Sequence, residues 1–213
     1  MTPTPRPDRD GLTLRERRAQ LTQDEILKAA RRLFGERGYA GTSMRDIAAA
    51  AGVSAQTVYD SVGSKQALVA RLNDLIDAEA GIADLARRAA TSTDPGEVVT
   101  TQARVTRSIL ENCSDIVRAL VSGAASEPDL RPPLEEGRRR HIFGAQQTIE
   151  RLRTLGALDE RLSPADAADT LAAISDVRCA LVLQDGYGWD LNRIETWIAT
   201  TSGALLLRPD RTA

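Results

Sequence analysis

The stretch from residue 42 to residue 65, TSMRDIAAAAGVSAQTVYDSVGSK, constrains the fold of this chain more than any other segment. Met44, Ile47 and Ala48 recur at helical spacing, so they give a first short helix one apolar side. Gly52 follows the alanine run, where a residue that readily adopts a positive φ ends a helix at low cost. The stretch therefore begins with a short helix that stops at a tight turn.

A second short helix is predicted directly after this turn. The hydroxyl of Ser54 suits its N-cap, because it accepts a hydrogen bond from an unpaired backbone N–H. Residues 55–61 then form the helix, with Val58 facing inward. Two short helices joined in this way form a helix-turn-helix, whose second helix enters the major groove of DNA. The stretch alone also leaves open an ordinary corner between two helices of a bundle.

The helix that supports this pair is expected over residues 23–37. Thr22 and Glu25 have the spacing of a capping box at its start, and Gly38 suits its end. Its apolar residues follow the pattern of one buried helix face. These residues are Ile26, Ala29, Ala30, Leu33 and Phe34.

Residues 22–68 resemble the DNA-binding domain of the TetR family of bacterial transcriptional regulators. The resemblance rests on Gly-Tyr at residues 38–39, Gly-Val-Ser at 52–54 and Ser-Lys-x-x-Leu at 64–68. It implies an all-α fold of about nine helices. An N-terminal three-helix helix-turn-helix DNA-binding domain would precede a C-terminal helical domain for ligand binding and dimerisation.

The composition agrees with an all-α protein that touches DNA with one end. Only 3% of the residues are aromatic, so Ala, Leu, Ile and Val must build the core. Residues 1–65 carry 11 Lys/Arg against 8 Asp/Glu, a net charge of +3, whereas residues 66–213 carry 17 against 22, a net charge of −5. A basic end on an acidic body suits DNA binding through that end.

We divide the chain into a disordered arm (1–14), a helix-turn-helix domain (15–65) and a helical ligand-binding and dimerisation domain (66–213). The arm is rich in Pro, Asp and Arg and cannot bury apolar surface. Just after it, three arginines form either an arm that reaches phosphates or the minor groove, or a solvated helical extension with Glu16 as a partner. They are Arg15, Arg17 and Arg18.

The helices of the C-terminal domain are predicted from caps, prolines and glycines. They are expected over about residues 65–88, 96–112, 114–125, 134–155, 164–184 and 191–207, with a loop at 126–133. The chain has no run of about 18 apolar residues and no apolar N-terminal region, so we expect a cytoplasmic protein without a membrane span or a signal peptide.

The exposed side of a helix-turn-helix makes the DNA contacts. Gln56 is expected to read a base, because its amide can pair with adenine N6 and N7. Ala55 would touch a thymine methyl group, and Thr57 a base or a phosphate. The remaining contacts are expected to be to phosphates, which set the register without reading sequence. They are Thr42, Ser43, Arg45, Ser54, Tyr59 and Lys65, and Lys65 also matches the phosphate lysine of the family.

Two apolar faces near the C-terminus are expected to form a homodimer interface, because two such pairs make a four-helix bundle. The alternative is that both faces pack on their own domain. The residues are Ala167, Leu171, Ile174 and Leu181 in one helix, and Ile194, Trp197, Ile198, Thr201 and Leu205 in the next. A twofold dimer would place two recognition helices about 34 Å apart, which suits a palindromic operator.

The resemblance also implies a pocket for a small molecule, whose binding would change the spacing of the two DNA-binding domains and release the operator. The alternative is that the candidate residues are core. They were chosen by central position in the helices, and they are Ile109, Cys113, Leu120, His141, Phe143, Gln147 and Arg178.

No enzyme, cofactor or metal site is expected. His141 is the only histidine, so a Ser-His-Asp set or a multi-histidine metal site could be built only around it. Cys113 and Cys179 lie far apart and are expected to be buried free thiols.

The sequence is best explained by a repressor that binds a palindromic operator as a homodimer and is released by an unidentified small molecule. An activator, or a regulator without a ligand, is the nearest variant. A second alternative is a helical ligand-binding or scaffolding protein whose N-terminal domain no longer binds DNA. Its support is that Val62 and Asp60 depart from the family pattern, which commonly has an aromatic residue and Tyr or His there. A third alternative, an enzyme, lacks a nucleophile paired with a base.

Overall fold

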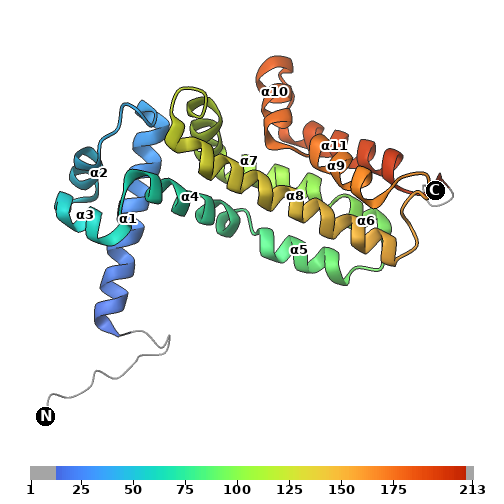
Figure 1. The fold of residues 1–213 in the computed structure, drawn as a ribbon, viewed down its shortest axis with the longest axis horizontal. Coiled ribbons are helices and arrows are strands. Elements are labelled where there is room, and N and C mark those ends of the chain that lie inside the picture. Colours follow the sequence, from blue (N-terminus) through green and yellow to red (C-terminus); the bar gives the residue numbers. More distant parts are fainter. Residues whose placement is uncertain (1–12, 210–213) are drawn as a thin grey trace, which may run out of the picture. The chain divides into compact units, whose positions relative to one another are not determined.

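The computed structural model describes residues 13–209, and the described chain is a succession of helices without strands (Figure 1). A single antiparallel bridge pairs Leu158 with Leu207. The all-α prediction is confirmed. None of the described helices has an apolar stretch long enough to span a membrane. The helices are α1 (Leu14–Arg37), α2 (Met44–Ala51), α3 (Ala55–Val62), α4 (Lys65–Glu79), α5 (Ile82–Thr91), α6 (Pro95–Val99), α7 (Thr101–Gly123), η1 (Pro128–Leu130), α8 (Arg131–Thr154), α9 (Pro164–Ile174), α10 (Val177–Tyr187) and α11 (Leu191–Leu206).

The described residues form two compact units. The head unit comprises residues 13–72 and 118–131, and the body unit comprises residues 73–117 and 132–209. The predicted domain boundary, between residues 65 and 66, lies in the first turn of α4. The head unit therefore also contains a segment that the sequence placed in the second domain.

Helix α1 begins well before the predicted start. Thr13 is its N-cap, and its side chain forms a capping box with Glu16. Thr22 lies inside the helix and donates a hydrogen bond to the carbonyl of Arg18 at 3.0 Å, so the predicted N-cap at Thr22 is wrong. Because no glycine or proline interrupts residues 14–21, the helix begins at the earlier capping box. Of the predicted disordered arm, residues 1–12 lie outside the described residues.

Three predicted helices differ from the structure. The helix expected over residues 65–88 ends at Glu79, because Gly81 adopts a left-handed conformation with φ of 61°. The helix expected over 164–184 is interrupted between α9 and α10, where Asp176 caps the second helix. The helix expected over 96–112 is interrupted at Thr100, between α6 and α7. The break expected between residues 112 and 114 is present as a kink inside α7, because Cys113 has a non-helical φ of −136° and ψ of 20°.

The core of the head unit is the predicted apolar stripe of α1 packed against α2 and α3. All five stripe residues are buried. Ile47 of α2 and Val58 of α3 have no exposed surface, and Val62 is also buried, where the family commonly has an aromatic residue. Burial of each such side chain contributes about 1.5–3 kcal/mol to folding.

The core of the body unit takes up much of the apolar face that was predicted to bind a second subunit. Ala167 and Leu171 belong to a buried cluster with residues of α6, α8 and α11. Leu181, Ile194 and Ile198 are buried as well. These five residues are at most 7% exposed, so they pack on the chain's own domain, which is the alternative.

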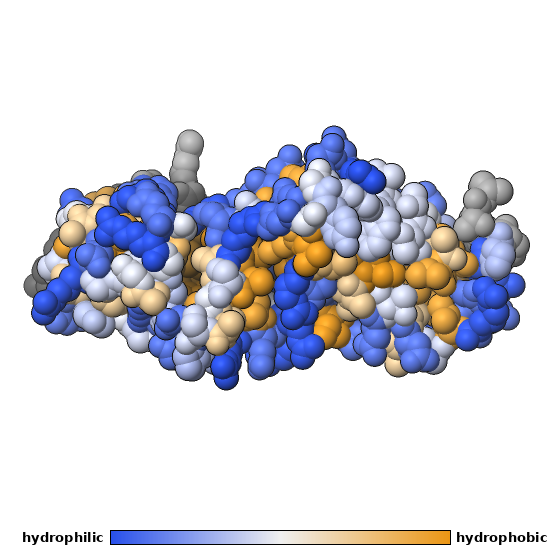
Figure 2. Space-filling view, turned by 90° about the horizontal axis from the view of Figure 1, so that it is seen from above, coloured by the Kyte–Doolittle hydropathy of each residue, from blue (hydrophilic) through white to orange (hydrophobic). Residues whose placement is uncertain are grey.

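The remaining residues of that predicted interface keep exposed surface. Leu205 is 49% exposed, and Ile174, Trp197 and Thr201 are partly exposed. Val182 and Tyr187 of α10 are exposed too. On the face drawn in Figure 2, hydrophobic residues gather over the part of the chain that carries the C-terminal helices.

Gly41, between α1 and α2, sits where a side chain has no room. A Cβ atom at this position would lie 2.4 Å from the backbone oxygen of Arg37. Because a backbone atom cannot rotate away, we expect Gly41→Ala to lower the free energy of unfolding by about 1–3 kcal/mol, as overpacking does elsewhere. Gly35, inside α1, is the matched control, because a Cβ atom there would meet no neighbouring atom within 4 Å. Gly35→Ala should raise the free energy of unfolding by about 0.5–1 kcal/mol. Urea denaturation measures both, and equal effects would contradict the clash.

Candidate nucleic-acid interface

Helix α2, the first helix of the helix-turn-helix, begins at a capping box. Ser43 is the N-cap, and its Oγ accepts the backbone N–H of Asp46 at 3.1 Å. The backbone N–H of Ser43 donates to Asp46 Oδ2 at 2.8 Å. Hydrogen bonds from the side chain and backbone of Ser43 lower the pKa of Asp46. Arg45 lies on the exposed side of this helix, as predicted.

The turn between α2 and α3 has the predicted geometry. Gly52 adopts a left-handed conformation with φ of 68° and ψ of 28°, and the N–H of Val53 donates to the carbonyl of Ala48 at 3.0 Å. Ser54 caps α3, its Oγ accepting the N–H of Thr57 at 3.0 Å. These bonds satisfy the backbone groups at the ends of both short helices. The two helices are thus held as a helix-turn-helix.

Helix α3 presents polar side chains to solvent. Ser54, Gln56 and Tyr59 are exposed, and Tyr59 keeps 51% of its surface free. Ala55 and Thr57 are partly buried. The amide Nε2 of Gln56 donates to Oδ1 of Asp60, one turn further along the helix, at 2.7 Å. This bond was not anticipated from the sequence, although an i, i+4 pair of Gln and Asp is a known helix contact.

Thr42 does not face the surface. It is 1% exposed, and its hydroxyl lies 3.2 Å from the carbonyl of Leu33 and 2.9 Å from that of Gly38. Its backbone N–H donates to Tyr39. The predicted phosphate contact of Thr42 is therefore wrong, because the side chain ties the end of α1 to the start of α2.

Lys65 is partly buried against Tyr39. Its Nζ donates to the carbonyl of Tyr39 and lies 3.8 Å from the centroid of the Tyr39 ring. Partial burial lowers the pKa of Lys65. An ammonium ion over an aromatic face is attracted by the ring. The predicted phosphate contact would have to compete with both interactions.

Tyr39 also joins the DNA-binding helices to the distant segment of the head unit. Its hydroxyl donates to Asp129 Oδ2 at 3.3 Å. Burial, followed by the negative charge of Asp129, raises the pKa of Tyr39 to about 12. Sequence reasoning identified Tyr39 only as part of the Gly-Tyr motif. Nothing local in the sequence indicates a partner 90 residues away.

Arg15, Arg17 and Arg18 belong to a helical extension, which is the second of the two alternatives for these arginines. All lie in the first turns of α1, where Arg15 and Arg18 are exposed and Arg17 is partly buried. Glu16 accepts the N–H of Thr13 at 2.7 Å. Further along, Gln23 donates from Nε2 to the carbonyl of Ser61 at 2.9 Å and so ties α1 to the end of α3.

The predicted ligand-binding residues differ in their exposure. Phe143 is 60% exposed, and Gln147 and Arg178 also lie on the surface. Arg178 pairs with Asp176 at 2.6 Å. Cys113 and Leu120 are buried, and Ile109 is partly buried. The exposure of these three side chains does not match the lining of an enclosed pocket.

His141 contacts the junction between α9 and α10. Its Nε2 lies 2.9 Å from the carbonyl oxygen of Ala172 and 3.3 Å from Oγ of Ser175. The carbonyl of buried Ser175 accepts a hydrogen bond from Thr106 of α7 at 2.6 Å. Residues 13–209 contain no group of three or more His, Cys, Asp or Glu side chains suited to a metal ion.

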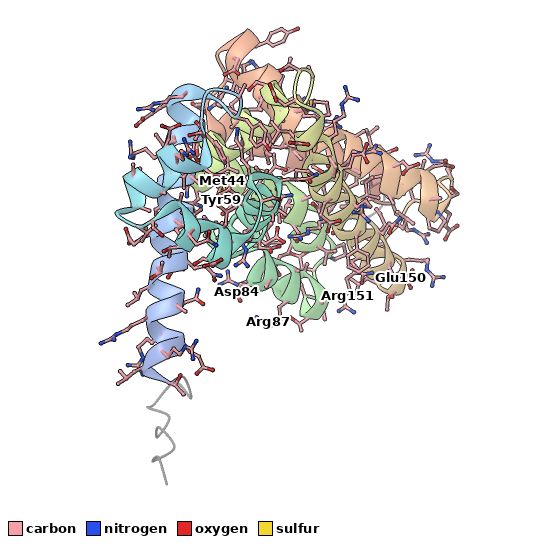
Figure 3. All side chains as sticks on the ribbon, turned by 60° about the vertical axis from the view of Figure 1, so that its left-hand side comes forward. Met44, Tyr59, Asp84, Arg87, Glu150 and Arg151 are labelled. Atoms are coloured by element: carbon pink, nitrogen blue, oxygen red, sulfur yellow. The ribbon has the colours of Figure 1, made fainter. Side chains whose placement is uncertain are left out.

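Arg140, beside His141 on α8, binds three carboxylates. It contacts Asp74 at 2.9 Å, Asp77 at 2.7 Å and Glu136 at 2.9 Å. These bonds raise the pKa of Arg140. Elsewhere on α8, Arg151 donates to the carbonyl of Ser92 after α5 (Figure 3). Helix α8 thus ties α4, α5 and the α9–α10 junction together within the body unit.

Comparison with known proteins identifies the family to which the helix-turn-helix is similar. The family model for bacterial regulatory proteins of the tetR family matches residues 26–72, which contain the whole helix-turn-helix. No curated relative matches the sequence.

Several solved structures share the fold over most of this chain. NalD, the secondary repressor of the MexAB-OprM multidrug efflux pump in Pseudomonas aeruginosa, is 23% identical with a TM-score of 0.71, covering 91% of this chain and 99% of that chain. A triclosan complex of SmeT, the repressor of the SmeDEF multidrug efflux pump of Stenotrophomonas maltophilia, is 22% identical with a TM-score of 0.72, covering 90% and 94%. FadR from Bacillus subtilis, in complex with stearoyl-CoA, is 16% identical with a TM-score of 0.70, covering 84% and 96%. Residues 26–72 therefore form an N-terminal domain of the tetR family of bacterial regulatory proteins, and the chain has the fold of solved regulators of that family.

Proposed function

We propose that this chain is a transcriptional repressor that binds a palindromic operator as a homodimer and is released by a small molecule. One observation carries the proposal. Two capped eight-residue helices, α2 and α3, meet at a glycine turn and expose Arg45, Gln56 and Tyr59 within the domain that matches the tetR family. In a helix-turn-helix, these are the positions that meet phosphates and base edges.

The dimer surface is proposed to consist of the outward side of α10 and α11. Val182, Tyr187 and Leu205 are exposed there, and Trp197 and Thr201 retain partial exposure. Exposed large apolar side chains that gather in one patch mark interaction surfaces. This surface keeps Trp197, Thr201 and Leu205 of the predicted interface and leaves out its buried residues.

Release by a small molecule is supported by the ligands in the relatives' structures. SmeT was solved with triclosan and FadR with stearoyl-CoA. We propose that the body unit binds an apolar ligand and that this binding shifts α8. The ion pairs of Arg140 with Asp74 and Asp77 would then transmit the shift from α8 to α4. A ligand shifts such an equilibrium only through different affinities for the two states.

The test of DNA binding is footprinting on the DNA upstream of the gene, at two salt concentrations. An inverted repeat should be protected, less so at high salt. For Arg45→Ala, the slope of log K against log salt should fall by about 0.9 for each phosphate that the protein no longer neutralises. Arg87, on α5 beside Asp84, gives the matched control, and Arg87→Ala should leave the slope unchanged (Figure 3). An unchanged slope in Arg45→Ala would remove Arg45 from the interface. If the full-length protein binds neither this DNA nor any duplex from a random pool, the alternative of a ligand-binding or scaffolding protein is favoured.

A further inference from the structure

The recognition helix α3 carries no basic side chain. Its sequence is AQTVYDSV, and its only charged residue is Asp60, which is exposed. The commonest specific contact to a base is Arg or Lys to guanine O6 and N7, and α3 has neither residue to make it. Any bases that α3 reads must therefore be read by amide, hydroxyl, methyl and carboxylate groups.

Asp60 sets the orientation of the one amide on this helix. Gln56 Nε2 donates to Asp60 Oδ1 at 2.7 Å. The amide group has two N–H bonds and one carbonyl oxygen, so one N–H and the oxygen remain for DNA. That donor and acceptor pair matches N7 and N6 of adenine. The bond to Asp60 thus holds Gln56 in a form suited to adenine.

The carboxylate of Asp60 also discriminates between bases directly. An ionised carboxylate only accepts hydrogen bonds, so it pairs with the exocyclic amino groups of cytosine N4 or adenine N6. Guanine presents two acceptors in the major groove and would be repelled. A negative charge near phosphates lowers the affinity for all DNA. Asp60 therefore weakens binding in general while it increases the selectivity between bases.

We propose that Asp60 is a specificity-determining residue, which positions Gln56 and makes α3 select base edges with exocyclic amino groups and reject guanine. The proposal rests on the proposed function, since it needs α3 to enter the major groove.

The experiment starts from duplexes that the full-length protein selects from a random-sequence pool at low salt. Each base pair of a selected half-site is then changed to each alternative, and affinities are compared. We expect adenine or cytosine at the bases nearest Gln56 and Asp60. Guanine at these positions should weaken binding by about 10-fold to 100-fold, the usual effect of a mismatched base pair.

Two variants separate the two roles of Asp60. Asp60→Asn keeps an acceptor for Gln56 and adds a donor for guanine O6, so it should reduce the discrimination against guanine by about 10-fold while retaining the preference for adenine. Asp60→Ala should lose both preferences. In the Gln56→Ala background, Asp60→Ala should no longer change the preference for adenine, because the group that Asp60 positions is gone.

The chain contains a matched control on α1. Gln20 Nε2 donates to Asp24 Oδ1 at 3.1 Å, also at i, i+4 spacing. Asp24→Ala removes the same charge and the same kind of helix contact, and should leave the base preferences unchanged. If Asp60→Ala keeps the wild-type base preferences, the inference is wrong and the proposed function stands. If the wild-type protein selects no duplex, both are wrong.

Discussion

Replacing Ile47 by alanine is expected to lower the free energy of unfolding by about 2–5 kcal/mol, the usual cost of this truncation in a core. Ile47 has no exposed surface, and its helix α2 packs against both α1 and α3. Removal of its methyl and methylene groups would leave a cavity between the three helices. Since a domain is stable by only about 5–15 kcal/mol, DNA binding should weaken through partial unfolding of the head unit.

The control for Ile47→Ala is Arg45→Ala, two residues earlier on the exposed side of α2. It should leave the free energy of unfolding within about 0.5 kcal/mol of the wild type while weakening DNA binding. Urea denaturation followed by circular dichroism gives the first quantity, and operator titration gives the second. Unchanged stability in Ile47→Ala would show that α2 is not held by this side chain.

The second large effect is expected for Leu171→Ala in α9. Leu171 is fully buried in the cluster that includes Ile149, Leu152 and Leu206. We expect the free energy of unfolding to fall by about 2–5 kcal/mol. Because the contacts are within one chain, this decrease should not depend on protein concentration, whereas a subunit contact would make it concentration-dependent.

Leu205→Ala is the matched control for Leu171→Ala, since the same truncation is made on a side chain that is 49% exposed. It should change the stability of the protomer by less than about 1 kcal/mol. If α11 forms the dimer surface, it should instead raise the dimer dissociation constant, which sedimentation at several concentrations measures. A concentration-dependent effect of Leu171→Ala would contradict its place in the protomer core.

Local signals explain why the helix-turn-helix was predicted nearly residue by residue. Met44, Ile47, Gly52 and Ser54 act through contacts with residues a few positions away, and the sequence shows both partners. Helix α2 ends at Gly52 as predicted, and the helix predicted over residues 55–61 agrees with α3 to within one residue at each end. The burial of Thr42, by contrast, depends on its bond to the carbonyl of Leu33, nine residues earlier, which no local pattern indicates.

Competing local signals explain the errors in helix ends. Thr22-x-x-Glu25 and Thr13-x-x-Glu16 have the same capping pattern, and the structure uses the earlier one. Gly81 was available as a stop signal, but an isolated glycine is also tolerated inside a helix. Only the conformation of Gly81, with φ of 61°, decides between these outcomes.

Apolar periodicity explains the error in the dimer face. The spacing of Ala167, Leu171 and Ile198 shows that they share apolar sides of their helices, but a partner subunit and the protomer core satisfy that pattern equally. The same limit applies to Phe143, whose central position in α8 says nothing about which side of the helix it occupies.

The head unit is discontinuous along the chain, and this affects how hybrid regulators can be built from it. A chimera that joins residues 13–72 to the C-terminal part of another regulator would bring Tyr39 without Asp129, which belongs to the same compact unit. Such a hybrid should include residues 118–131 as well. In this protein the exchangeable module is defined by packing and not by order along the chain.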